Sequence, residues 1–257
     1  MVGMNRRHAI IHMAALAALA SAVVAGVPRP YRASLVAGGK INGRWLAGIL
    51  VELEPGWKTY WRVPGDAGIP PQFDWSGSIN MQAIDVEFPI PTRLSDASGE
   101  AIGYHDKVLF PLVVTPLKTD QDVQLKLKMF FAICKVVCIP ADALLEASLT
   151  ASASSALITS WQQRVPVVAA TPVVLGARIE QRERKPMLVL DLSGTFEDVF
   201  IESDTDIYFG HPRFDIMPGE AWLPIANSKD VAALKNLSLK VTLSAGNTGI
   251  EQSITVN

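Results

Sequence analysis

The chain has 257 residues, 49% of them apolar and 19% charged, with a formal net charge of −2. This length and composition suit one large or two small globular domains. The near-zero charge excludes the basic field with which proteins hold nucleic acid, so we expect no nucleic-acid partner.

Residues 1–26 have the pattern of an export signal. Arg6 and Arg7 give a basic start, an apolar run follows over 9–26, and small residues at 20–25 offer cleavage points. This order is typical of a secretory signal peptide. An apolar run of about 18 residues also fits an uncleaved membrane anchor. We favour cleavage, and we expect a mature chain outside the cytoplasm with no membrane span, where disulfides can form.

Short β-type segments follow the signal. Residues 45–53 and 57–62 read as strands separated by the turn signal Pro55-Gly56. The segment 107–117 is also rich in β-formers, and Pro111 predicts an edge or bulged strand because proline cannot donate to a ladder. These segments predict a β-sandwich domain over residues 30–152.

The clearest strand is "DVQLKLKMFFAIC", residues 122–134. Its apolar and polar residues alternate with period two, which places one set on the buried face of a sheet. The predicted core-facing residues are Val123, Leu125, Leu127, Met129 and Phe131. This strand delivers the chain directly to a cysteine.

The second half of the chain predicts a further β domain. Residues 154–164 read as a helix with Ser154 or Ser155 as its cap. A proline-bounded stretch at 165–172 marks a boundary, so we assign 153–170 to a helix and linker and 171–257 to the second domain. Its strand-like segments are 173–181, 187–194, 198–203, 206–210, 237–246 and 251–257, and 228–236 predicts a short helix. The fold class is therefore all-β, with two sandwiches in tandem.

Cys134 and Cys138 are the two cysteines of the sequence. In an extended strand, four residues would separate their Cα atoms by about 13 Å. A disulfide needs a separation below about 7 Å, so a bonded pair requires the chain to turn between them. We expect Pro140 to help end that turn.

The residues alone leave three roles open for this pair. As a staple it is weak, since closing a loop of about five residues gives roughly 2 kcal/mol against about 4.7 for a hundred-residue loop. As a redox pair it is well suited, because a tight ring exchanges readily and Lys135 supplies a charge that favours a thiolate. As a metal clip it offers ligands for copper(I) or zinc but needs further donors. His105 is a possible donor, although it reads as a surface histidine.

Other recognisable chemistry is missing from the sequence. We find no nucleophile elbow, zinc-protease motif, phosphate loop or dinucleotide fingerprint, so we expect no cofactor and no metal site. Four tryptophans gather early in the chain, and we expect some to fill the core and others to rim the cysteines. They are Trp45, Trp57, Trp61 and Trp75.

A family resemblance joins these features. The runs "GWKTYWRVPGDAGIPPQFDWSGSIN", "FPIPTRL", "GYHDKVLFPLVVTP" and "CKVVCIPADALLEASL" occur in order within residues 43–150. Together they resemble the N-terminal periplasmic domain of the DsbD/ScsB family of thiol:disulfide interchange proteins, in its ScsB-like branch. The C-terminal half is similar, more weakly, to the second β domain of ScsB-like proteins.

The resemblance implies immunoglobulin-like sandwiches and a periplasmic redox pair at Cys134 and Cys138. It also implies a cap loop beside the pair, matched by position with Tyr60 and with residues 95–105, which include Asp96 and His105. Ala97 and Ser98 stand where the family has bulk, so we expect Tyr104 or a tryptophan to shield the pair.

The resemblance implies protein-disulfide oxidoreductase activity as well. The expected partners are periplasmic thioredoxin-like proteins and a membrane electron conduit. Family members carry a membrane domain and a thioredoxin-like domain that this sequence lacks, so we expect electrons to come from a separate protein. The alternative is a non-catalytic periplasmic β-sandwich that binds a protein or copper, with the cysteines as a structural clasp.

Overall fold

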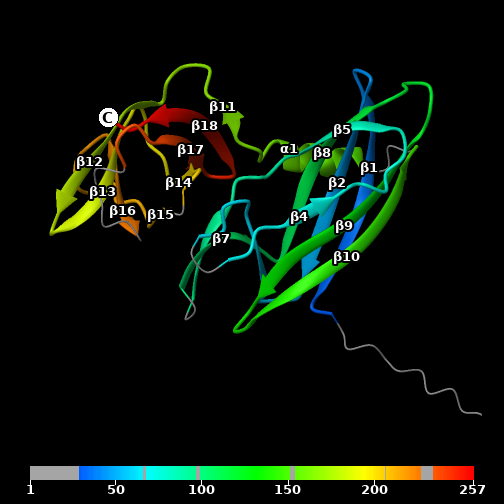
Figure 1. Ribbon diagram of the computed structural model, residues 1–257, viewed down its shortest axis with the longest axis horizontal. Coiled ribbons are helices and arrows are strands. Elements are labelled where there is room, and N and C mark those ends of the chain that lie inside the picture. Colours follow the sequence, from blue (N-terminus) through cyan, green and yellow to red (C-terminus); the bar gives the residue numbers. More distant parts are fainter. Residues whose placement is uncertain (1–28, 66–67, 97–98, 151–153, 206, 227–233) are drawn as a thin grey trace, which may run out of the picture.

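The computed structural model describes residues 29–65, 68–96, 99–150, 154–205, 207–226 and 234–257. The expected signal peptide and most of the predicted helix at 228–236 lie outside these ranges. The described chain is almost entirely β, and Figure 1 shows two β domains side by side. The predicted all-β class with two tandem immunoglobulin-like domains is confirmed.

The first domain packs two sheets face to face. One sheet has the order β1 (Tyr31–Ile41), β2 (Arg44–Leu53), β8 (Lys107–Pro116), β5 (Met81–Val86). The other has the order β10 (Cys138–Leu149), β9 (Val123–Cys134), β3 (Lys58–Tyr60), β7 (Gly99–His105), β6 (Thr92–Asp96), and β4 (Gln72–Asp74) also pairs with β9. The alternation predicted for β9 is confirmed, since all five core-facing residues are buried.

The expectation that Pro111 marks an edge or bulged strand is wrong. Strand β8 lies inside its sheet, between β2 and β5, and its register with β2 is unbroken. The carbonyl of Pro111 accepts a hydrogen bond from the amide of Glu87, just beyond the end of β5. The N and C=O of a strand residue point to the same side, so the missing N–H faces the end of β5 and leaves the β2 ladder intact.

Two local expectations also differ from the structure. The strand expected at 57–62 covers only Lys58–Tyr60. The cap loop expected at 95–105 is β structure in its described part, the end of β6 and all of β7. Of the four tryptophans, Trp61 lies in the first domain's core, and Trp45, Trp57 and Trp75 are half-buried against it.

The second domain has two four-stranded sheets. The first has the order β11 (Val167–Val168), β18 (Thr248–Thr255), β17 (Ser238–Ala245), β14 (Asp198–Ser203). The second has the order β12 (Val174–Arg182), β13 (Lys185–Leu192), β16 (Glu220–Ala226), β15 (Tyr208–Phe209). Strand β16 was not among the predicted segments.

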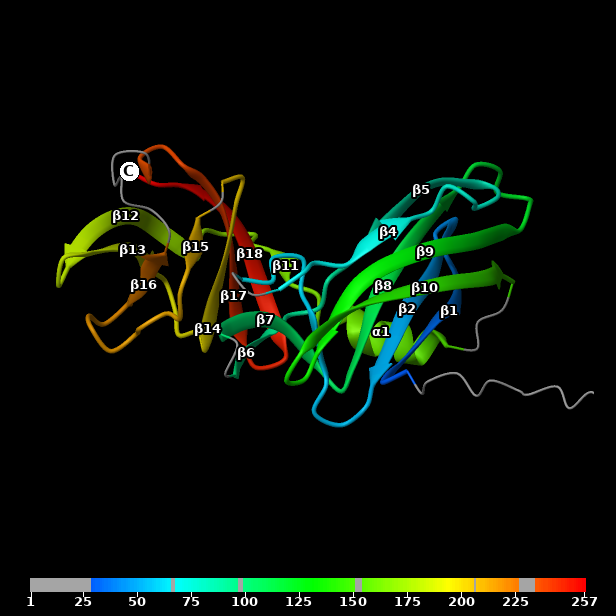
Figure 2. The same cartoon turned by 60° about the horizontal axis from the view of Figure 1, so that its bottom comes forward.

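Helix α1 (Ser155–Gln162) leads into the connection between the domains. It buries Ile158 and Trp161, and it lies against β8, β1 and β2 (Figure 2). Ser154 is its N-cap by position, but the serine side chain makes no capping hydrogen bond. Within the described ranges, no helix has the length and apolar character needed to span a bilayer.

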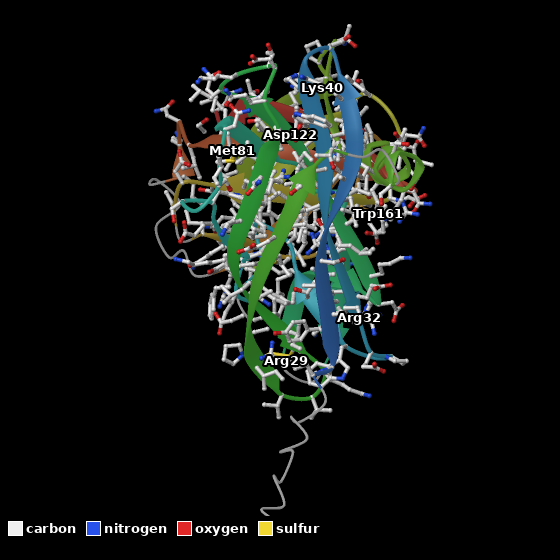
Figure 3. The ribbon with its side chains drawn as sticks, turned by 90° about the vertical axis from the view of Figure 1, so that its right-hand side faces the viewer. Arg29, Arg32, Lys40, Met81, Asp122 and Trp161 are labelled. Atoms are coloured by element: carbon white, nitrogen blue, oxygen red, sulfur yellow. A yellow bond between two sulfur atoms is a disulfide. The ribbon has the colours of Figure 1, made fainter. Side chains whose placement is uncertain are left out.

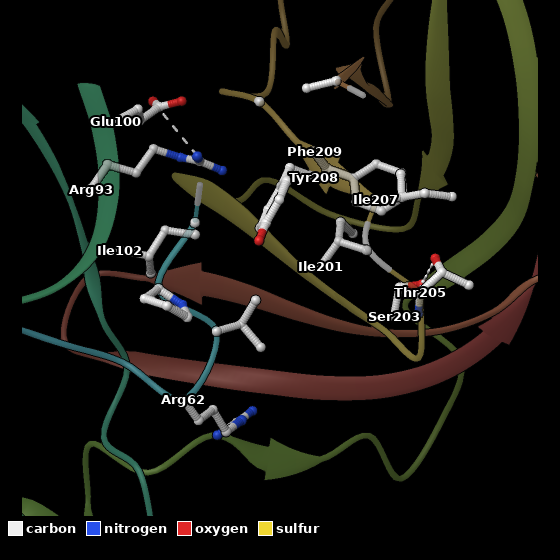
Figure 4. A pocket seen from close by; sticks show the side chains of 15 residues that line it. Arg62, Arg93, Glu100, Ile102, Ile201, Ser203, Thr205, Ile207, Tyr208 and Phe209 are labelled. Atoms are coloured by element: carbon white, nitrogen blue, oxygen red, sulfur yellow. Dashed lines mark hydrogen bonds and ion pairs between the residues drawn. The ribbon is translucent and has the colours of Figure 1, made fainter. Parts of the chain in front are cut away.

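The two domains share an interface beside β3. Phe200 of β14 packs with the first domain's core, with its ring centroid 5.7 Å from that of Trp61. The Arg62 guanidinium pairs with Glu202 and Glu251 of the second domain. A cavity of about 270 Å³ lies between the two domains and is lined by residues of both, with Arg62 at its edge. Figure 4 shows these side chains.

Candidate functional site

The two cysteines close a β-hairpin. Cys134 is the last residue of β9 and Cys138 the first of β10, and they lie directly opposite each other in the ladder. Their sulfurs are bonded, with the Cα atoms 4.1 Å apart. The predicted turn is therefore confirmed and consists of residues 135–137. Pro140 does not end it, because it lies within β10 opposite Ala132.

The hairpin end lies at one tip of the first domain (Figure 3), where Arg29 also lies. This position leaves the two sulfurs in different surroundings. Cys134 is 0% exposed, whereas Cys138 is an exposed residue. Cys138 is therefore the more accessible residue of the pair.

The pair lies on the face of its sheet that points away from the sandwich core. Ile133 and Phe131 belong to the core face of β9, so Cys134 and Ala132 occupy the opposite face. There Cys134 joins a small separate cluster of buried residues. Its other members are Tyr60, Leu94, Ala101 and Ala132.

Tyr60 is the expected supporting residue that the structure places at the disulfide. Its hydroxyl lies 3.2 Å from the Sγ of Cys138, within hydrogen-bonding distance for sulfur. The ring is 1% exposed, and a Cβ on Gly68 would lie only 2.7 Å from it, so the chain packs closely over Tyr60. The sulfur of Cys138 is thus in contact with a buried, closely packed side chain.

The other expected supporting residues lie in different positions. Tyr104 is on the core face, where its hydroxyl donates to the Pro89 carbonyl at 2.8 Å, and burial raises its pKa well above the usual value. His105 is exposed at the end of β7. The Lys135 ammonium donates to the Pro55 carbonyl at 3.1 Å. Asp96 ends β6, and its side chain lies outside the described part of the structure.

Two residues of β3 were missed by sequence reasoning. Thr59 donates its hydroxyl to the Ala132 carbonyl at 2.9 Å, which ties β3 to β9. Lys58 is 4% exposed and lies directly opposite Cys134 in the β3–β9 ladder. The sequence could have indicated Lys58, because residues two apart in a strand lie on the same face of the sheet, and Tyr60 was already expected near the cysteines.

The disulfide is not needed to hold this hairpin together. The β9–β10 ladder continues without a register shift from the cysteines to the Leu149–Val123 pair. A loop of this size adds roughly 2 kcal/mol in the chain-entropy model. Most of the pairing in this hairpin therefore lies in its backbone ladder.

Exposed apolar residues flank Cys138 along the chain. Val136 and Val137 form the tip of the turn and are 86% and 68% exposed, and Ile139 follows Cys138 on β10. Exposed apolar residues in a group are typical of protein contact sites. No group of three or more His, Cys, Asp or Glu side chains among the described residues is arranged to hold a metal ion.

Comparison with known proteins gives one family. Residues 33–150 match the family model "Thiol:disulfide interchange protein DsbD, N-terminal". No curated protein matches the chain. Among solved structures, the chain is similar to the N-terminal periplasmic domain of ScsB from Proteus mirabilis, with 22% identity and a TM-score of 0.68 over 87% of this chain and 92% of that one. At this identity the likeness shows a shared fold.

Proposed function

We propose, from the match of residues 33–150 to the family model of DsbD N-terminal domains, that the Cys134–Cys138 pair passes electron pairs between partner proteins. The observation that carries the proposal is the asymmetry of the disulfide. One residue of the pair is exposed, its bonded neighbour is buried, and the hairpin that carries both has a continuous ladder of its own.

The asymmetry assigns separate roles to the two sulfurs. A thiolate of a reduced dithiol protein attacks the Sγ of Cys138, the Cys134–Cys138 bond breaks, and its electron pair leaves with Cys134. The donor's second thiolate then attacks the donor sulfur of the mixed disulfide and releases Cys138. The donor ends as a disulfide and this chain as a dithiol, with protons exchanged with water. The reverse sequence reduces a partner disulfide.

The partners proposed are a membrane electron conduit as donor and periplasmic thioredoxin-like proteins as acceptors. The apolar side chains of Val136 and Val137 provide a contact surface beside the exposed sulfur. A periplasmic location is supported by the fold that this chain shares with the N-terminal periplasmic domain of ScsB.

The first test uses single cysteine variants incubated with an oxidised thioredoxin-fold protein. Reduced Cys134→Ser keeps the exposed thiol and lacks the resolving one, so it should accumulate a stable mixed disulfide on non-reducing electrophoresis. Cys138→Ser keeps only the buried thiol and should form almost none. Full exchange activity in both variants would refute the proposal.

A further inference from the structure

The cavity between the two domains combines an apolar lining with a charged pair. Both domains contribute to the apolar lining, which includes Pro64, Ile102, Ile201, Ile207 and Phe209. The charged pair is Arg93 of β6 and Glu100 of β7, at one side of the cavity (Figure 4). Its volume of about 270 Å³ lies just below the range of sites for drug-sized ligands, so it suits a smaller molecule.

Arg93 has unused hydrogen-bonding capacity in this cavity. Its Nε donates to Asp198 at 3.0 Å and its Nη2 to the Val199 carbonyl at 2.8 Å. Among the described residues, its Nη1 has only the Glu100 carboxylate, at 3.6 Å, which is beyond hydrogen-bonding distance. The arginine side chain is 7% exposed, and a buried N–H group without an acceptor is costly. The Nη1 atom therefore calls for an acceptor.

The other charged side chains of the lining leave this position open. The Arg62 guanidinium is held by Glu202 and Glu251 of the second domain. The Glu100 side chain is 33% exposed, so it can turn into solvent. An ion pair that is partly exposed and this long contributes little, and a ligand can replace it at small cost.

A second donor enters the cavity from the other domain. Tyr208 of β15 is half-buried in the lining, and Figure 4 shows its hydroxyl directed into the space between Ile102 and Ile201. Within the described ranges this hydroxyl has no hydrogen-bond partner. Each domain thus supplies one unused donor, and both donors border apolar side chains.

We propose that this cavity binds a small carboxylate with an apolar body. The carboxylate accepts hydrogen bonds from Arg93 Nη1 and the Tyr208 hydroxyl, since an ionised acceptor makes the stronger bonds to such donors. The apolar body lies against Ile102, Ile201 and Phe209 and leaves water. Binding here needs no redox step, so it stands apart from the exchange proposed for the cysteines.

The test is calorimetric titration of the disulfide-bonded chain with 3-phenylpropionate. Binding should saturate with a dissociation constant of about 1 mM or tighter. The neutral analogue 3-phenylpropionamide has the same shape and should bind about tenfold more weakly, because hydrogen bonds to a charged acceptor are stronger. No saturable binding up to about 10 mM, or equal binding of the amide, would overturn the inference.

Variants locate the binding in the cavity. Tyr208→Phe should weaken 3-phenylpropionate about tenfold, whereas Tyr31→Phe, whose hydroxyl donates to the Asp142 carbonyl elsewhere in the first domain, should have no effect. Ala226→Phe, at an exposed position of the lining, should fill the cavity and abolish binding. Unchanged binding in both Tyr208→Phe and Ala226→Phe would place the ligand elsewhere and refute the site.

A change at Glu100 tests the competition for Arg93. Glu100→Gln should tighten 3-phenylpropionate about two- to fivefold, because the side chain no longer pairs with the guanidinium. Glu146→Gln, at an exposed ion pair with Lys126, is the control and should change nothing. Weaker binding in Glu100→Gln would contradict the assigned position of the carboxylate.

A free acid and the carboxyl end of a peptide present the same chemistry to this cavity. The tripeptide Gly-Gly-Phe carries the same ring and carboxylate as 3-phenylpropionate. Tighter binding of the tripeptide would identify a peptide terminus as the source of the ligand. Weaker binding, which the small volume predicts, would identify a free acid.

Discussion

At the scale of single residues, the two tyrosines expected near the disulfide have separate roles. Tyr60 lies on the outer face of its sheet with its hydroxyl 3.2 Å from the Cys138 sulfur. Tyr104 lies on the core face, and its ring packs edge-on against Phe110. The pair offers a matched comparison, because the same Tyr→Phe change removes one hydroxyl from each.

Tyr60→Phe should make the disulfide harder to reduce. The hydroxyl can donate to the Cys138 thiolate once the bond opens, and a hydrogen bond to a charged group contributes about 1.5 kcal/mol or more. Losing it destabilises the reduced form and should shift the reduction potential about 30 mV more negative. Equilibration with a glutathione redox buffer measures the shift. An unchanged potential would show that the contact has no part in the redox chemistry.

Tyr104→Phe is the control and should leave the potential unchanged while lowering the free energy of unfolding by about 1 kcal/mol. Its pH dependence has a definite sign. Burial raises the folded-state pKa of Tyr104 above 10.0. The contribution of Tyr104 to stability is therefore fully present below the unfolded pKa of about 10 and is lost as pH rises through the folded pKa. Denaturation curves at alkaline pH should show a smaller loss in the variant.

At the scale of elements, the β9–β10 hairpin brings the redox chemistry and the contact surface together. Its strands place the sulfurs opposite each other, and its turn exposes Val136 and Val137 beside them. Leu144 lies on the same β10 strand and is 79% exposed, but it is six residues beyond Cys138, or about 20 Å along the strand. The hairpin thus contains its own control position.

The double change Val136→Asp and Val137→Asp should slow exchange with a thioredoxin-fold dithiol about tenfold or more, because a partner would have to desolvate two carboxylates. Reduction by a small dithiol should change little, since that reagent needs no contact surface. Leu144→Asp should affect neither rate. Stopped-flow measurements with both reductants distinguish the cases, and equal slowing by Leu144→Asp would contradict a docking role for the turn.

Period and spacing predicted much of this hairpin. The alternation in β9 correctly identified its buried face, and the distance limit on a disulfide correctly required a turn after Cys134. Pairing between distant strands could not be predicted in this way. Lys58 meets Cys134 only because β3 pairs with β9, and Pro111 is tolerated only because its nitrogen faces the end of β5.

At the scale of the whole molecule, the second domain supplies part of the first domain's core. Phe200 extends from β14 into the first domain's core and meets Trp61, the residue that follows Tyr60. Arg93, next to Leu94 in β6, holds Asp198 at 3.0 Å and donates to the Val199 carbonyl at 2.8 Å. Strand β3 and the β6–β7 hairpin, which lie beside the disulfide in the first domain, are therefore also held by contacts with the second domain.

Phe200→Ala should lower the free energy of unfolding by about 3–5 kcal/mol, since it leaves a cavity in a core shared by both domains. Amide protection around β3 and β7 in the first domain should fall, and hydrogen exchange measures this directly. Leu175→Ala, at an exposed position of the second domain, should change neither quantity. Loss of protection confined to the second domain would show that the two domains are not coupled through Phe200.

The reduction potential of the Cys134–Cys138 pair tests the central claim most directly. Structural disulfides of exported proteins have potentials below about −300 mV, while exchangeable ones lie higher. With one exposed cysteine residue, a short loop and a hairpin that has its own ladder, the pair should have a potential above about −300 mV. A value below that limit would identify the bond as a structural clasp and contradict the exchange function proposed for this chain.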